Sequence, residues 1–147
     1  MIAALLIAAA VNPIEFFRGR THGEGTLKIV FNDPKRISVD SLGRAGKAGS
    51  LRLDQLIREP GKAPRRRVWY FRQTGPNRFQ GTLSDAAGPV RIDLHRNRLR
   101  IRYTDRKNFH FEQWLTPAGP RHVRNRMRVS RFGITLAHFD EVIRKHD

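Results

Sequence analysis

The chain has 147 residues, a length that predicts one domain able to bury a single hydrophobic core. It carries 29 Lys and Arg against 13 Asp and Glu, a net charge of +16, and it has no cysteine. The missing cysteine excludes disulfides, thiol catalysis and zinc–thiolate sites. The charge indicates either anionic partners, such as nucleic acid or acidic lipid, or a solvated surface filled with arginine.

The N-terminal segment predicts an apolar leader. The run 1–11 is unbroken apolar sequence rich in Ala and Leu. It is too short to span a bilayer, which takes about 20 residues. Its small residues at 8–10 suit signal cleavage, although a basic stretch before it is missing, and an ordinary packed helix is the alternative. We therefore expect a signal-like leader over 1–12, one β-barrel domain over 13–147, and a periplasmic or membrane-associated place in the cell envelope.

Beyond the leader, the chain predicts a short helical turn followed by strands. The turn is expected over 14–17, because Pro13 suits the first position of a helix. Apolar side chains then recur with period two between turn residues, which is typical of half-buried strands. The expected strands are 24–31, 36–42, 50–57, 65–74, 77–84, 88–95, 97–104, 108–115, 121–130 and 134–143, the last of them strand or partly helix. About ten such strands predict an all-β antiparallel up-and-down barrel, because closure removes exposed edges.

The segment 97–104 is the clearest strand, because arginine and apolar side chains alternate along it. Burying an unpaired arginine costs several kcal/mol, whereas burying Leu or Ile gains roughly 1.5–3 kcal/mol. We therefore expect Leu99, Ile101 and Tyr103 inside and the arginines outside. The segment 121–130 alternates in the same way, so its arginines and those of 97–104 are candidates for a basic surface.

Several short motifs follow one another in a specific order. They are Phe17-Arg18-Gly19, Gly23-Glu24-Gly25, Arg67-Val68-Trp69, Phe79-Gln80-Gly81, Leu99-Arg100-Ile101-Arg102-Tyr103, Phe111-Glu112-Gln113-Trp114, Asn125-Arg126 and Ser130-Arg131-Phe132-Gly133. This pattern resembles the bacterial family of domain of unknown function 3833, whose members are often labelled lipoproteins. The resemblance covers about residues 16–145 and implies a lipocalin-like antiparallel barrel in the cell envelope, with no established activity. Lipid attachment is not expected, because it requires a cysteine and this chain has none.

Patterns for catalysis or metal binding are not evident. The six histidines show no paired ligand spacing, and the acidic residues are scattered, so ion pairs with arginine are the expected role of the acids. The segment Thr21-His22-Gly23-Glu24-Gly25 resembles a phosphate loop but lacks the Lys-Ser/Thr ending and a following helix. Its glycines are expected to serve a bend or bulge. We expect no enzyme, no metal and no cofactor.

The aromatic side chains are the candidates for a ligand site inside the barrel. The candidate interior residues are Trp69, Phe71, Tyr103, Phe109, Phe111, Trp114, Asn125 and Met127. They either line a ligand cavity or form a packed core. Asn125 lies among apolar residues of inward phase, where a buried amide is a polar anchor in a cavity or a satisfied core group.

The predicted function is that of a non-enzymatic, lipocalin-like barrel of the bacterial cell envelope. Its interior binds a small apolar or amphipathic ligand, and its basic surface keeps it near anionic membranes. The alternative is polyanion or nucleic-acid binding through the arginine-rich surface. Nucleic acid is disfavoured, because β-sheet readers stack bases on aromatic side chains of the binding face, and here those are expected on the opposite face.

Overall fold

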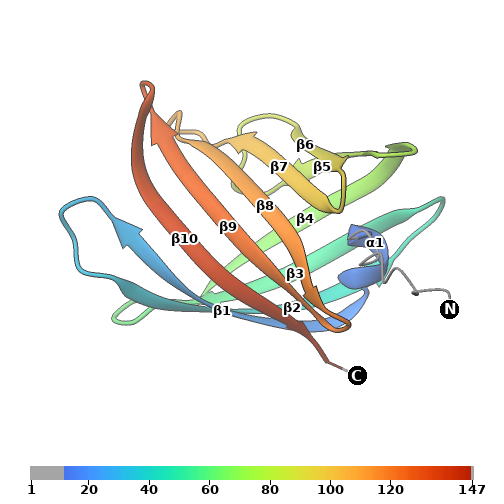
Figure 1. Ribbon diagram of the computed structural model, residues 1–147, viewed down its shortest axis with the longest axis horizontal. Coiled ribbons are helices and arrows are strands. Elements are labelled where there is room, and N and C mark those ends of the chain that lie inside the picture. Colours follow the sequence, from blue (N-terminus) through green and yellow to red (C-terminus); the bar gives the residue numbers. More distant parts are fainter. Residues whose placement is uncertain (1–11, 147) are drawn as a thin grey trace, which may run out of the picture.

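Ten antiparallel strands follow one another around a closed barrel in the computed structural model, which describes residues 12–146 (Figure 1). The strands are β1 (Gly19–Ile29), β2 (Lys35–Ala45), β3 (Ser50–Arg58), β4 (Arg65–Gly75), β5 (Arg78–Leu83), β6 (Val90–His95), β7 (Arg98–Thr104), β8 (His110–Gly119), β9 (His122–Arg131) and β10 (Ile134–Lys145). Each strand pairs with the next along the chain, and β10 pairs with β1 to close the barrel. The predicted all-β up-and-down barrel is confirmed, and its last segment is strand throughout. The leader expected over 1–12 lies outside the described residues, except for Asn12.

One end of the barrel is closed by a helical turn, α1 (Pro13–Phe16), as the sequence predicts. The side-chain oxygen of Asn12 caps the turn by accepting a hydrogen bond from the backbone N–H of Ile14 at 3.0 Å. Lys145, at the end of β10, donates to three backbone oxygens of α1 and the following residues at 2.8–3.0 Å. These bonds hold the turn in place, and Ile14 and Phe17 are buried in the core. No helix among residues 12–146 is long and apolar enough to cross a membrane.

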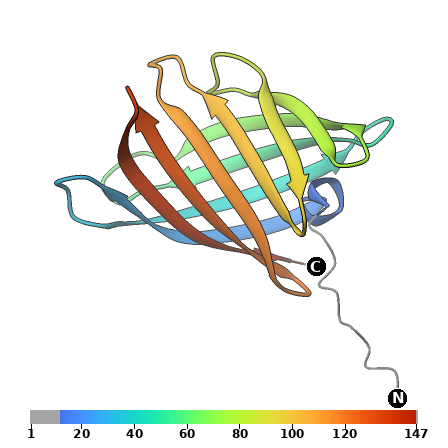
Figure 2. The same ribbon diagram turned by 45° about the horizontal axis from the view of Figure 1, so that its top comes forward.

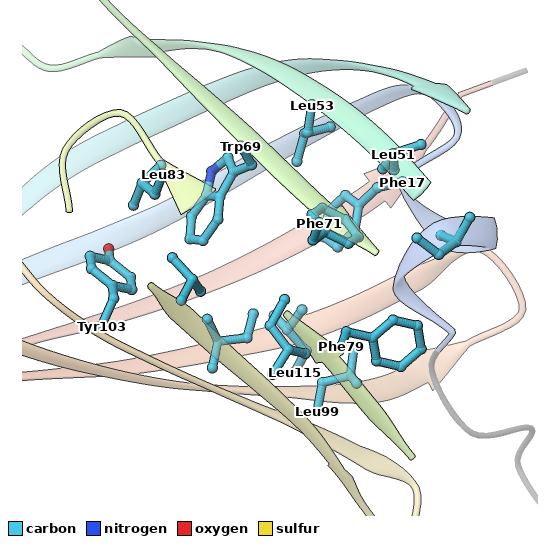
Figure 3. Packing of buried hydrophobic residues seen from close by; sticks show 14 of the residues in the cluster. Phe17, Leu51, Leu53, Trp69, Phe71, Phe79, Leu83, Leu99, Tyr103 and Leu115 are labelled. Atoms are coloured by element: carbon cyan, nitrogen blue, oxygen red, sulfur yellow. The ribbon is translucent and has the colours of Figure 1, made fainter. Parts of the chain in front are cut away.

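The barrel core divides into a packed end, beside α1, and an open end. Large apolar side chains fill the packed end, where Leu51 and Leu99 are 1% and 0% exposed (Figure 3). A smaller cluster occupies the open end and consists of Ile37, Val39, Ile57 and Phe139. The hairpin between β1 and β2 projects from the open end, opposite α1 (Figure 2). The two ends therefore differ in how completely side chains fill them.

The alternation predicted over 97–104 is confirmed in β7. Leu99, Ile101 and Tyr103 are at most 7% exposed. The arginines between them lie on the outer face, where two of them form ion pairs with acidic residues of neighbouring strands. The outer surface is thus basic but partly neutralised by its own acids.

Gly23 and Gly25 lie in continuous strand, so the bulge expected at these glycines as one of two alternatives is wrong. The register of β1 with both of its neighbours runs through them without a shift. A Cβ atom at Gly23 would lie 2.2 Å from Oε2 of Glu141, and one at Gly25 would lie 2.6 Å from the ring of Phe139. The two glycines therefore leave space inside the barrel for these side chains.

Candidate ligand-binding cavity

A cavity of about 640 Å³ lies at the open end of the barrel. Its wall is mainly apolar and includes Leu27, Ile37, Ile57, Phe111, Met127 and Phe139. The volume falls within the range of roughly 300–1,000 Å³ that is typical of small-molecule sites. A second, inner space of about 50 Å³ lies toward the packed end. It has room for only a few water molecules, so the outer cavity is the candidate ligand site.

The structure places the eight predicted interior residues in three settings. Five of them line the large cavity: Tyr103, Phe109, Phe111, Asn125 and Met127. Two others, Trp69 and Phe71, face inward but line the small inner space. The remaining residue, Trp114, is on the outer face of the barrel. Contact of any of them with a ligand stays a prediction.

Trp114 is wrong as an interior residue, because the alternation along β8 turns it outward. Phe111 and Leu115 of the same strand face the interior, and a residue of the opposite phase must face solvent. The guanidinium carbons of Arg98 and Arg100 lie 4.6 and 5.4 Å from the Trp114 ring centroid. The basic outer face therefore carries an aromatic side chain, so the expectation that aromatic residues lie only on the opposite face is wrong, and nucleic acid is not disfavoured on that ground.

A polar network lies at the floor of the cavity, between the two spaces. The side-chain oxygen of Gln55 accepts hydrogen bonds from Nε1–H of Trp69 and from Nε–H of Arg67, both at 2.7 Å. The Gln55 amide nitrogen donates to the hydroxyl of Ser41 at 3.1 Å. Arg67 lines both the cavity and the inner space. Gln55 therefore holds a cationic side chain inside the barrel.

Asn125 and Glu141 form a second polar pair at the floor. Nδ2 of Asn125 donates to Oε1 of Glu141 at 3.0 Å, and both residues are at most 6% exposed. Burial raises the pKa of Glu141 above the ordinary value of 4.5, although the Asn125 hydrogen bond and the Arg67 charge oppose this rise. Oδ1 of Asn125 is buried and has no hydrogen-bond partner among the described residues. The floor therefore offers an unsatisfied acceptor beside a carboxyl whose neutral form burial favours.

Stacked aromatic rings connect this floor with the cavity wall. The rings of Tyr103 and Phe111 lie parallel with centroids 4.7 Å apart, and Trp69 meets Tyr103 edge-on at 5.6 Å. Aromatic pairs at these separations are favourable beyond their buried area. The wall between floor and mouth is therefore formed by packed aromatic rings on this side.

Five polar residues that line the inner space were not predicted from the sequence: Ser41, Gln55, Arg67, Gln113 and Glu141. Strand phase alone could have identified them. Arg67 has the phase of Trp69 in β4, and Glu141 has the phase of Phe139 in β10. The expectation that acidic residues pair with surface arginines is wrong for Glu141, which bonds Asn125 inside the barrel.

Comparisons with known proteins identify a family and a fold. The family model described as "Protein of unknown function (DUF3833)" matches residues 8–145, in agreement with the sequence motifs. No curated protein matches the chain. Among solved structures, the S-type phycobiliprotein lyase from Guillardia theta has a TM-score of 0.70 at 7% identity, with 91% of each chain covered. A de novo designed fluorescence-activating β-barrel has a TM-score of 0.51 at 11% identity, with 92% of this chain and 99% of that chain covered. At these identities the likeness shows the fold alone.

Proposed function

Because the chain belongs to DUF3833, a family of unknown function, its role has to be inferred from the site, and we propose that the barrel binds a small amphipathic molecule. The observation that carries this proposal is the cavity of about 640 Å³ with an apolar wall and a polar floor. Protein interiors normally pack without voids of this size, since empty space forfeits dispersion and burial energy. A cavity kept at the open end of an otherwise packed barrel therefore favours a ligand.

The names of the similar barrels support the same proposal. One is a phycobiliprotein lyase and the other is a fluorescence-activating design. We propose that the present barrel acts by binding rather than by catalysis. Its described cavity-lining side chains include no Ser, Thr, His or Asp, and Lys62 and Glu59 at the mouth are paired with each other.

Dye binding with a blocked cavity tests the proposal. Ala137 lines the cavity, whereas His138, the next residue of β10, is exposed on the outer face. Ala137→Phe fills part of the cavity, and His138→Phe adds the same ring outside it. We expect Ala137→Phe to weaken binding of Nile red by about tenfold or more and His138→Phe to leave it unchanged. Equal affinity of both variants, each with a cooperative thermal transition, would place the dye elsewhere and contradict the proposal.

Two exposed phenylalanines at the open end support a function at a membrane surface. Phe31, in the β1–β2 hairpin, is 101% exposed, and Phe132, in the β9–β10 hairpin, is 77% exposed. Their φ angles are +66° and +53°, a left-handed conformation that costs a side chain other than glycine on the order of 1 kcal/mol. Neither the exposed rings nor the left-handed backbone at these residues stabilises the fold. Arg131 lies over the Phe132 ring at 4.9 Å, which adds positive charge at this tip.

We therefore propose that the open end meets an anionic membrane surface in the cell envelope and that Phe31 and Phe132 enter the lipid interface. Co-sedimentation with phosphatidylglycerol vesicles tests this. The double variant Phe31→Ser/Phe132→Ser should lose most of the bound fraction. Tyr70→Ser, which changes an exposed aromatic residue elsewhere on the outer face, should lose little. Equal binding of the double variant and the unaltered protein would leave only general charge attraction and contradict the proposed orientation.

A further inference from the structure

Arg67 differs from the other cationic side chains of the cavity in its partners. At the mouth, Lys62 pairs with Glu59 at 3.4 Å, and Arg65 pairs with Asp85 at 2.5 Å. Arg67 lies deeper on the inner face of β4 and forms no ion pair with a carboxylate of residues 12–146. The charges at the mouth are thus neutralised by the protein itself, whereas the charge at the floor is not.

The contacts of Arg67 orient its guanidinium and leave donors free. Nε–H donates to Gln55 at 2.7 Å, and the guanidinium carbon lies 5.4 Å from the Trp69 ring centroid. Among the described residues, neither Nη group donates to a protein acceptor. A guanidinium presents its N–H groups in a planar fork that fits a carboxylate, and a partly desolvated cation without a counter-ion is unfavourable. The floor of the cavity therefore suits an anion from outside the chain.

Glu141 does not supply that anion. Its carboxyl is bonded to Asn125 and buried against Gly23, and burial raises its pKa and so favours the neutral form. Among residues 12–146 no ion pair joins Glu141 to Arg67, so the guanidinium has no bonded counter-ion inside the barrel.

The cavity also sets the orientation and the size of the head group. Between Arg67 and the mouth the wall is apolar and includes Phe111, Met127 and Phe139. An apolar tail is accommodated there, while the polar groups lie at the floor and, as ion pairs within the protein, at the mouth. Beyond the floor only about 50 Å³ remains, so the head group must be small.

We propose that the cavity binds a single-tailed amphiphile with a carboxylate head, the head lying inward on Arg67 and the tail extending toward the mouth. The inference rests on the proposed binding function and names its ligand class. Two ligands with the same tail, laurate and dodecanol, separate the contribution of the head from that of the tail.

Isothermal titration calorimetry of both ligands with matched variants tests the proposal. Arg67→Met removes the interior cation, and Arg66→Met removes the exposed arginine beside it on the opposite face of β4. We expect the laurate-to-dodecanol affinity ratio to fall about tenfold to a hundredfold in Arg67→Met and to stay unchanged in Arg66→Met, because charge-assisted hydrogen bonds are lost only in the first. Arg67→Lys keeps the charge without the planar fork and should retain an intermediate ratio.

The outcomes distinguish this inference from the function on which it rests. If Arg67→Met binds dodecanol as tightly as the unaltered protein does, the variant is folded. A lower laurate-to-dodecanol affinity ratio in this variant then supports the carboxylate site. If dodecanol binds but the ratio is the same in Arg67→Met as in the unaltered protein, the carboxylate inference is overturned and the binding function stands. If neither ligand binds the unaltered protein, both are overturned.

Discussion

The packed end and the open end of the barrel are made by the same ten strands but differ in what those strands enclose. Beside α1, Leu99, Leu51 and Phe17 fill the interior almost completely. At the other end, apolar side chains of the same kind line about 640 Å³ of open space. Strand alternation therefore determines which side chains face inward, whereas α1 adds Ile14 and Phe17 to the core at one end only. We infer that the packed end stabilises the fold and the open end serves binding.

Truncation of a core side chain at each end should give the largest difference in the free energy of unfolding. Leu99→Ala leaves a hole in a closely packed region and should lower the free energy of unfolding by about 2–5 kcal/mol. Met127→Ala enlarges a cavity that already exists and should cost clearly less, on the order of 1 kcal/mol. Urea denaturation of both variants measures the difference. Similar losses at the two positions would mean that the open end stabilises the fold as much as the packed end.

The α1 plug can be disturbed without touching a core side chain. A Cβ atom at Gly43 would lie 1.7 Å from the carbonyl oxygen of Phe17, so Gly43→Ala must move the chain that leads from α1 into β1. We expect a loss of about 1–3 kcal/mol, as for other overpacked sites. Gly88→Ala is the control, because nothing lies within 4 Å of its Cβ position. Identical thermal transitions for the two variants would show that the contact between Gly43 and α1 does not matter.

Glu141 makes stability depend on pH at the boundary between the two ends. Because its pKa is raised above 4.5 in the folded state, Glu141 holds its proton more firmly in the folded protein than in the unfolded chain between pH 4.5 and the raised pKa. The contribution of Glu141 to stability therefore falls as the pH rises through that window. Glu141→Gln should remove this dependence and melt at a higher temperature than the unaltered protein at neutral pH, with little difference below about pH 4. Thermal melts over this pH range check the sign, and a lower melting temperature of the variant at neutral pH would contradict it.

The smallest effect should appear at the exposed tips of the open end. Asn tolerates the left-handed backbone better than Phe, so Phe31→Asn and Phe132→Asn should each stabilise the fold by about 0.5–1 kcal/mol. The same variants should bind phosphatidylglycerol vesicles more weakly, which separates folding from membrane contact. The free energy of unfolding and the vesicle-bound fraction, measured for each variant, test whether higher stability accompanies weaker membrane binding. A destabilised Phe132→Asn would mean that the ring supports the fold rather than a surface interaction.

The strands were predictable because the free-energy cost of burying a charged side chain applies at every second residue along them. Arginine alternates with Leu99 and Ile101 in β7, and only one of the two phases can be buried. The start of β1 was harder to predict. It begins at Gly19 rather than at 24, because its inward positions hold Thr21 and Gly23, which are small where Glu141 fills the interior. Strand ends of this kind depend on neighbours far away in sequence.

The apolar part of the candidate site was predicted, whereas for its polar residues strand phase indicates only that they face inward. Aromatic residues such as Tyr103 and Phe111 indicate an interior wall, yet no sequence pattern shows that Arg67 is held by Gln55 of the adjacent strand. A charged side chain is assigned to the surface unless its cross-strand partner is known. The size of the cavity could not be predicted either, because it depends on how closely side chains from different strands pack across the barrel.

The central claim is that a ligand occupies the interior of the open end, and Met127 provides a direct reporter of it. The chain has two methionines, Met1 and Met127, and Met127 lines the cavity. In protein labelled with carbon-13 at the methionine methyl groups, titration with laurate should shift the Met127 resonance in parallel with the calorimetric binding curve. A Met127 resonance that stays unchanged while calorimetry shows saturation would place the ligand outside the cavity and contradict the account.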